Sequence, residues 1–218
     1  MSMEGLKIKK GEYMMKKKYL MLLLSLILVL AACGGGGAEN SNEESQPEGQ
    51  SAFGTEQIEY FEAINQDEET VTRDDLLGQW WVADFIFTNC TTVCLPMTSN
   101  MKILQDGLKE AGIEDVQLVT FSIDPDRDTP EVLKEYGNEY GADFSNWHFL
   151  TGYDFEYIKN YSISEFKNLV QEPPEGDDQI IHGTAFYLIN PDGVIYKHYS
   201  GTQADAMDEI IADLKEQL

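Results

Sequence analysis

The chain has 218 residues and a strongly acidic composition, with 39 Asp and Glu against 15 Lys and Arg and a formal net charge of −24 at pH 7. Proteins that bind nucleic acid neutralise phosphates with basic side chains, so we expect no nucleic-acid partner. The charge also keeps the folded part soluble and opposes its direct contact with an anionic lipid surface.

The first 32 residues have the pattern of a signal peptide, because three lysines at 16–18 precede an apolar run over residues 20–32. The run ends in Leu-Ala-Ala-Cys at Cys33, which resembles the lipobox of bacterial lipoproteins. With about 13 residues it is shorter than the roughly 20 that a membrane-spanning helix needs, although an uncleaved anchor is the alternative. We therefore expect lipidation at Cys33 and a lipid-anchored protein at the outer face of the bacterial cytoplasmic membrane.

Residues 33–55 are expected to be the lipidated cysteine and a flexible linker. Four glycines followed by mostly polar residues offer too little apolar surface to offset the entropy of ordering. Residues 56–218 are long enough for one domain with one core. Removal of residues 1–32 takes away six Lys and two Glu, which leaves 9 basic and 37 acidic residues and a formal charge of −28.

Predicted strands and helices alternate along this domain. The segment WWVADFIF at 80–87 is rich in aromatic and β-branched residues and predicts a buried strand. Pro96 is suited to the start of a helix that runs to Lys109. Further strands are predicted at 116–123, 148–150, 184–190 and 194–199, and further helices after Pro130 and over 155–161 and 204–215. This order predicts an α/β fold with a mixed central sheet and helices on both faces.

The pair Cys90 and Cys94 falls between the predicted strand at 80–87 and the helix after it. The positive end of a helix favours thiolate over thiol, and the thiolate is both the nucleophile and the metal ligand. Residues at i and i+4 of a helix have neighbouring β-carbons, so the two sulfurs can form a disulfide or bind one metal ion. A purely structural disulfide is the alternative, but its five-residue loop would constrain the unfolded chain little.

Three histidines could complete a metal site: His148, His182 and His198. His148 lies in a short predicted strand, and His198 is on the outward phase of the last strand, so both are expected to be structural or solvated. His182 stands in a predicted loop just before a strand, from which it could face another loop.

Three segments, FIFTNCTTVCLPMTSNM, FSIDPDRDTPEVLKEYG and IIHGTAFYLINPDGVIYKHYSG, resemble the Sco/SenC family of copper proteins. The resemblance implies a thioredoxin-like fold and a role in assembly of the dinuclear copper centre of cytochrome c oxidase. It also implies that Cys90, Cys94 and His182 bind copper and that the copper-accepting subunit of the oxidase is the partner. Leu95 departs from the family, which usually has proline directly after the second cysteine.

The chemistry of the implied ligands agrees with copper. Soft thiolates select Cu(I), and an imidazole makes Cu(II) tolerable, so two sulfurs and one nitrogen can hold either oxidation state. Zinc would normally take a fourth ligand. Met97 and Met101 could add thioethers, but at helical spacing they are expected in the core.

Two further residues are candidates for supporting the site. Asp124 closes a predicted strand at the same edge and could orient or charge-balance the metal site. The alternative is that Asp124 and Asp128 hold a turn and cap the following helix. Thr184 aligns with the position of the cis-proline that faces the cysteines in thioredoxins, so the usual substrate groove should be altered there, with His182 nearby.

The leading hypothesis is a copper metallochaperone, which binds Cu(I) or Cu(II) and is not an enzyme. The alternative is an extracytoplasmic thiol-disulfide oxidoreductase that uses a redox-active disulfide between Cys90 and Cys94 to maintain the cysteines of the oxidase subunit or other exported proteins. Thioredoxin-like reductases generally have two residues between the cysteines, whereas this chain has three. The same thiols could serve both roles.

Overall fold

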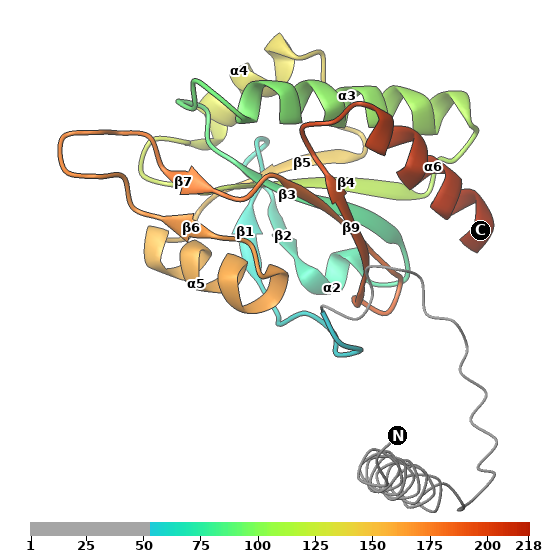
Figure 1. The fold of residues 1–218 in the computed structure, drawn as a ribbon. Helices are drawn as coiled ribbons and strands as arrows, with labels where there is room; N and C mark the ends of the chain where they lie inside the picture. Colours follow the sequence, from blue (N-terminus) through green and yellow to red (C-terminus); the bar gives the residue numbers. More distant parts are fainter. Residues whose placement is uncertain (1–52) are drawn as a thin grey trace, which may run out of the picture. The chain divides into compact units, whose positions relative to one another are not determined.

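The computed structural model of the protein describes residues 53–218 (Figure 1). The expected signal peptide, the lipidation site Cys33 and most of the expected linker lie outside the described residues. No helix within residues 53–218 is both long enough and apolar enough to cross a membrane. The described elements are, in chain order, β1 (Glu62–Ile64), β2 (Thr70–Thr72), α2 (Arg73–Leu76), β3 (Trp80–Ile86), α3 (Cys94–Glu110), β4 (Val116–Ser122), α4 (Pro130–Glu139), β5 (Trp147–Leu150), α5 (Phe155–Phe166), β6 (Val170–Gln171), β7 (Ile181–His182), β8 (Ala185–Ile189), β9 (Ile195–Ser200) and α6 (Asp205–Gln217).

A five-stranded sheet in the order β5-β4-β3-β8-β9 forms the centre of the domain. β3, β4 and β5 are parallel, whereas β8 pairs antiparallel with both β3 and β9. β3 is buried along its whole length and β4 at all but one residue. Strands covered on both faces are expected to be apolar on both faces, as these two largely are. The mixed sheet confirms the predicted α/β class.

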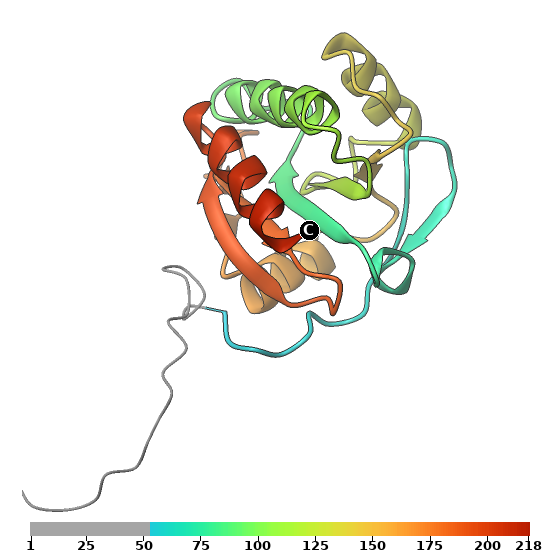
Figure 2. The ribbon, with the colours of Figure 1, turned by 90° about the vertical axis from the view of Figure 1, so that its right-hand side faces the viewer.

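Helices cover both faces of this sheet. α3, α4 and α6 lie on one face and α5 lies on the other (Figures 1 and 2). On the α5 side, Phe85 of β3 stacks on Phe121 of β4 with ring centroids 5.2 Å apart, and Phe166 of α5 meets Phe85 edge-on at 5.0 Å. These aromatic contacts pack α5 against β3 and β4 in the middle of the sheet. β3 is the strand that leads to the cysteines.

The structure differs from the sequence-based expectation at several boundaries. α3 begins at Cys94 rather than at Pro96, so the second cysteine is the first helical residue. α5 extends to Phe166, and Lys167 ends it in the left-handed conformation with φ 53°. β1, β2, α2, β6 and β7 were not predicted, because two to four residues are too few to show a periodic pattern.

The segment that carries His182 is one of these unpredicted strands. β7 pairs antiparallel with β6, where His182 lies opposite Val170 and Ile181 opposite Gln171. The expectation of a loop position is therefore wrong in detail. The ladder continues through the N–H of Gly183, which donates to the carbonyl of Leu169 at 2.9 Å. His182 is thus attached through its backbone to the chain that follows α5.

Candidate metal centre

The two cysteines stand where the loop after β3 turns into helix α3. The backbone N–H of Cys90 donates to the carbonyl of Phe87 at 3.2 Å, which turns the chain at the end of the strand. Cys94 is the first residue of α3, so both sulfurs lie near the positive end of this helix. Both thiols are free, and both residues are buried, with 5% of Cys90 and none of Cys94 exposed.

His182, the last residue of β7, contacts the cysteine pair. Its Nε2 lies 3.1 Å from Sγ of Cys94. The ligand atoms of Cys90, Cys94 and His182 all lie within 4.8 Å of one another. The structure therefore brings together the three residues that the sequence singled out, and within residues 53–218 no other group of three His, Cys, Asp or Glu side chains is placed to hold a metal ion.

The tautomer of His182 follows from its second hydrogen bond. Nδ1 lies 2.8 Å from the carbonyl oxygen of Gly183. A carbonyl can only accept, so Nδ1 carries the proton, and in the neutral ring Nε2 then carries a free lone pair. That lone pair faces the two sulfurs. A metal-bound histidine ordinarily has this arrangement, in which one nitrogen binds and the other donates to a carbonyl or carboxylate.

The two thiols have very different acidities. Interaction with the thiol of Cys94 lowers the pKa of Cys90 far below its ordinary value, and the backbone amides of Thr92 and Cys94 act in the same direction. The pKa of Cys94 is raised, first because the sulfur of Cys90 accepts from it and then because it is buried. Of the two sulfurs, Cys90 therefore favours the thiolate form, which is the nucleophile and the soft metal donor.

Asp84 is a buried carboxyl close to this site that sequence reasoning missed. It lies in the middle of β3 and is 1% exposed. Its Oδ1 accepts from the hydroxyl of Thr120 at 2.7 Å, while Oδ2 has no hydrogen-bond partner. Burial raises the pKa of Asp84 to about 7, against the opposing effects of the Thr120 hydrogen bond and His182. An acidic residue within the apolar strand WWVADFIF was the available signal.

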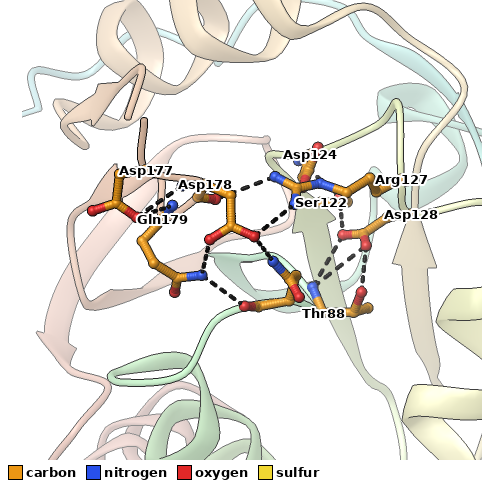
Figure 3. A network of polar contacts seen from close by, with 9 residues as sticks. Thr88, Ser122, Asp124, Arg127, Asp128, Asp177, Asp178 and Gln179 are labelled. Carbon is orange, nitrogen blue, oxygen red and sulfur yellow. Dashed lines mark hydrogen bonds and ion pairs between the residues drawn. The ribbon is translucent and has the colours of Figure 1, made fainter. Parts of the chain in front are cut away.

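Asp124 and Asp128 belong to a polar network at the ends of β3 and β4 (Figure 3). Oδ2 of Asp124 forms an ion pair with Nε of Arg127 at 2.5 Å. Asp128 is fully buried and accepts from the N–H of Thr88 at 3.2 Å and from its hydroxyl at 2.5 Å. Helix α4 is capped by Thr129, so the expected cap by an aspartate is wrong, whereas the expected turn-holding role agrees with these contacts.

The remaining candidates lie where their contacts are structural. Thr184 precedes β8, and its carbonyl accepts from the N–H of Gly201 at 2.8 Å. His148 of β5 and the exposed His198 of β9 are outside the thiol cluster. Met97 and Met101 are fully buried on the core face of α3.

The fold and the site together define a thioredoxin-like protein in which a histidine faces a cysteine pair. The SCO1/SenC family model matches residues 49–218. The chain therefore belongs to the SCO1/SenC family, and the predicted resemblance and thioredoxin-like fold are confirmed.

Three relatives illustrate the range of the family. The SCO1 protein homolog of Bacillus subtilis is 45% identical over 159 residues, which cover 73% of this chain and 81% of the relative. The crystal structure of a SCO1/SenC family lipoprotein from Bacillus anthracis is 47% identical with a TM-score of 0.70, over 73% of this chain and 94% of the other. The copper-bound crystal structure of ScoI from Arabidopsis thaliana is 26% identical with a TM-score of 0.63, over 73% and 98%.

Proposed function

We propose that this protein is a copper metallochaperone that binds one copper ion through Cys90, Cys94 and His182 and serves assembly of cytochrome c oxidase. The observation that carries the proposal is the convergence of the three ligand atoms within 4.8 Å, with the lone pair of Nε2 turned to the sulfurs. A copper-bound structure within the family supports it.

The residues present fit copper as cargo. Two soft sulfurs favour Cu(I), and the imidazole adds a donor that also suits Cu(II). The lowered pKa of Cys90 favours its thiolate, which is the form that binds a metal ion. Three protein ligands leave the ion open to a recipient's donors, which is what a carrier requires and what a closed four-ligand site would prevent.

We further propose that the partner is the copper-accepting subunit of the oxidase and that the protein acts at the outer face of the cytoplasmic membrane. A family lipoprotein from Bacillus anthracis supports lipid anchoring through Cys33. A tether between the lipid and the domain would hold the copper site near membrane-bound recipients and raise the effective concentration of the site there.

Thiol-disulfide exchange is the second candidate function. The acidic thiol of Cys90 beside the protonated thiol of Cys94 is the arrangement that attacks disulfides in oxidoreductases. The two functions make different demands on His182. A copper carrier needs it as the third ligand, whereas dithiol exchange needs only the two sulfurs.

The test is complementation of a strain that lacks the gene. We expect low cytochrome c oxidase activity in that strain, restored by the wild-type gene, restored poorly by Cys90→Ser, Cys94→Ser or His182→Ala, and partly relieved by added copper. His148→Ala is the matched histidine control and should restore fully. Full restoration by His182→Ala, with none by either cysteine variant, would replace copper delivery by thiol reduction as the function.

A further inference from the structure

The strand of His182 and the loop of Cys90 belong to different parts of the fold. β7 pairs with β6 in a two-stranded sheet that is separate from the central sheet. The cysteine loop, residues 88–93, extends from β3 of the central sheet. Gly183 and Thr184 connect His182 to β8, which pairs with β3. Contacts between the loop before β7 and the cysteine loop add a second constraint on the spacing between the histidine and the cysteines.

Gln179 makes such a contact, three residues before His182. Its Oε1 accepts from the backbone N–H of Thr91 at 3.1 Å, and its Nε2 donates to the backbone carbonyl of Asn89 at 3.1 Å. These are the two main-chain groups on either side of Cys90. One side-chain amide thus binds both, as a neighbouring strand would, because an amide carries a donor and an acceptor in one plane.

Asp178 extends the same contact toward the end of β4. Its Oδ2 accepts from Nδ2 of Asn89 at 2.7 Å and from a guanidinium nitrogen of Arg127 at 3.2 Å, and its carbonyl accepts from Arg127 at 3.2 Å (Figure 3). Arg127 is also paired with Asp124. The loop before β7 is therefore held at both the cysteine loop and the turn that follows β4.

We propose that Gln179 is a positioning residue for the metal site, whose amide sets the distance between the Cys90 loop and His182. The proposal rests on the proposed copper-binding function and assigns to it a residue that does not touch the metal. The neighbouring ion pair of Arg127 with Asp178 is exposed and salt-screened, whereas the Gln179 amide is uncharged and bonds to the main chain of the cysteine loop. A ligand set held in advance loses less entropy when the ion binds.

Loss of the Gln179 amide should change the copper site and leave the fold intact. In Gln179→Ala the loop of Cys90 keeps its connections through Thr88 and Asp128, and β7 keeps its ladder with β6. The fold is therefore expected to persist while His182 samples positions away from the sulfurs. Copper should then be released faster, and the fraction of Cu(II) that shows nitrogen coupling should fall.

The experiment measures Cu(I) affinity by competition with a chromogenic chelator on the full-length protein in detergent, together with the Cu(II) electron paramagnetic resonance spectrum. We expect Gln179→Ala to weaken Cu(I) binding about tenfold, the size expected from one or two lost hydrogen bonds. Gln203→Ala, an exposed glutamine in the turn before α6, is the matched control and should remain within about twofold of wild type.

The double variant Gln179→Ala/His182→Ala gives the sharpest result. If the Gln179 amide acts through His182, the double variant should bind copper with the same affinity as His182→Ala, with no further loss. A second tenfold loss in the double variant, or a Gln179→Ala affinity equal to wild type, would overturn the proposal. A copper-free Gln179→Ala protein whose melting temperature falls in proportion to its loss of copper affinity would also overturn the proposal, because the amide would then act through the stability of the fold. Equal affinity of wild type and His182→Ala would instead refute the ligand set of the proposed function.

Discussion

Sγ of Cys94 lies 3.1 Å from Nε2 of His182, although the two residues are 88 positions apart in the chain. The first residue of α3 and the last residue of β7 are therefore in direct contact. Because both sulfurs are free and close to the same nitrogen, the site can exist either as a three-donor metal site or as a dithiol.

Copper and a disulfide should exclude each other at this site, because a sulfur in the Cys90–Cys94 bond is no longer a thiolate donor. We expect the reduced protein to bind one copper ion and the oxidised protein to bind little. Metal analysis before and after oxidation, with the disulfide confirmed by mass, tests this. Equal copper uptake in the two states would show that the cysteines are not shared.

Asp84 should make the stability of the copper-free domain depend on pH. Burial raises its pKa from 3.8 to about 7, so between these values the folded state holds a proton that the unfolded chain has released. Unfolding then releases a proton, so the free energy of unfolding falls as the pH rises toward about 7. The loss levels off above that pH.

Asp84→Asn removes this titration. We expect the free energy of unfolding to fall by about 3 kcal/mol less in the variant than in wild type between about pH 5 and about pH 8. Denaturant titration at several pH values measures the difference. Thr120 can still donate to the amide oxygen, so the substitution keeps the local hydrogen bond. Parallel pH profiles of the two proteins would contradict a shifted carboxyl at position 84.

The sequence pattern predicted the surroundings of two of the three proposed ligands, and the family resemblance supplied the third. Cys90 and Cys94 were predicted with the correct surroundings, because a long apolar strand and a long amphipathic helix bracket them. His182 was selected through the family resemblance, since its two-residue strand has no periodic signal. The contacts of Asp84 and Gln179 depend on pairings such as Asp84 with Thr120 and Gln179 with Thr91, which are long-range and leave no pattern in a single sequence.

Gly183 is required beside His182 because no side chain fits there. A Cβ at this position would lie 2.1 Å from Oδ1 of the buried Asn168. Gly183→Ala should therefore displace that amide and destabilise the domain by about 1–3 kcal/mol. In an Asn168→Ala background the obstacle is absent, so the same substitution should cost markedly less. Thermal and denaturant unfolding of the four proteins measures the coupling, and additive effects would contradict it.

Lipid anchoring is tested at Cys33, which lies outside the described residues. If the lipid is attached to the sulfur of Cys33, as we propose, Cys33→Ser should release the protein from the membrane fraction or leave its signal peptide uncut. Cys94→Ser is the matched cysteine control and should remain in the membrane fraction. Mass spectrometry of the mature protein identifies its N-terminus, and a terminus other than Cys33 would refute lipidation there.

The central claim is that Cys90, Cys94 and His182 together bind one copper ion. The most direct measurement is the copper content and X-ray absorption spectrum of the reduced, copper-loaded protein, compared with His182→Ala and His148→Ala. We predict one copper per chain, with two sulfur donors and one nitrogen donor, and loss of the nitrogen in His182→Ala alone. Retention of the full spectrum by His182→Ala, with its loss in His148→Ala, would contradict the account.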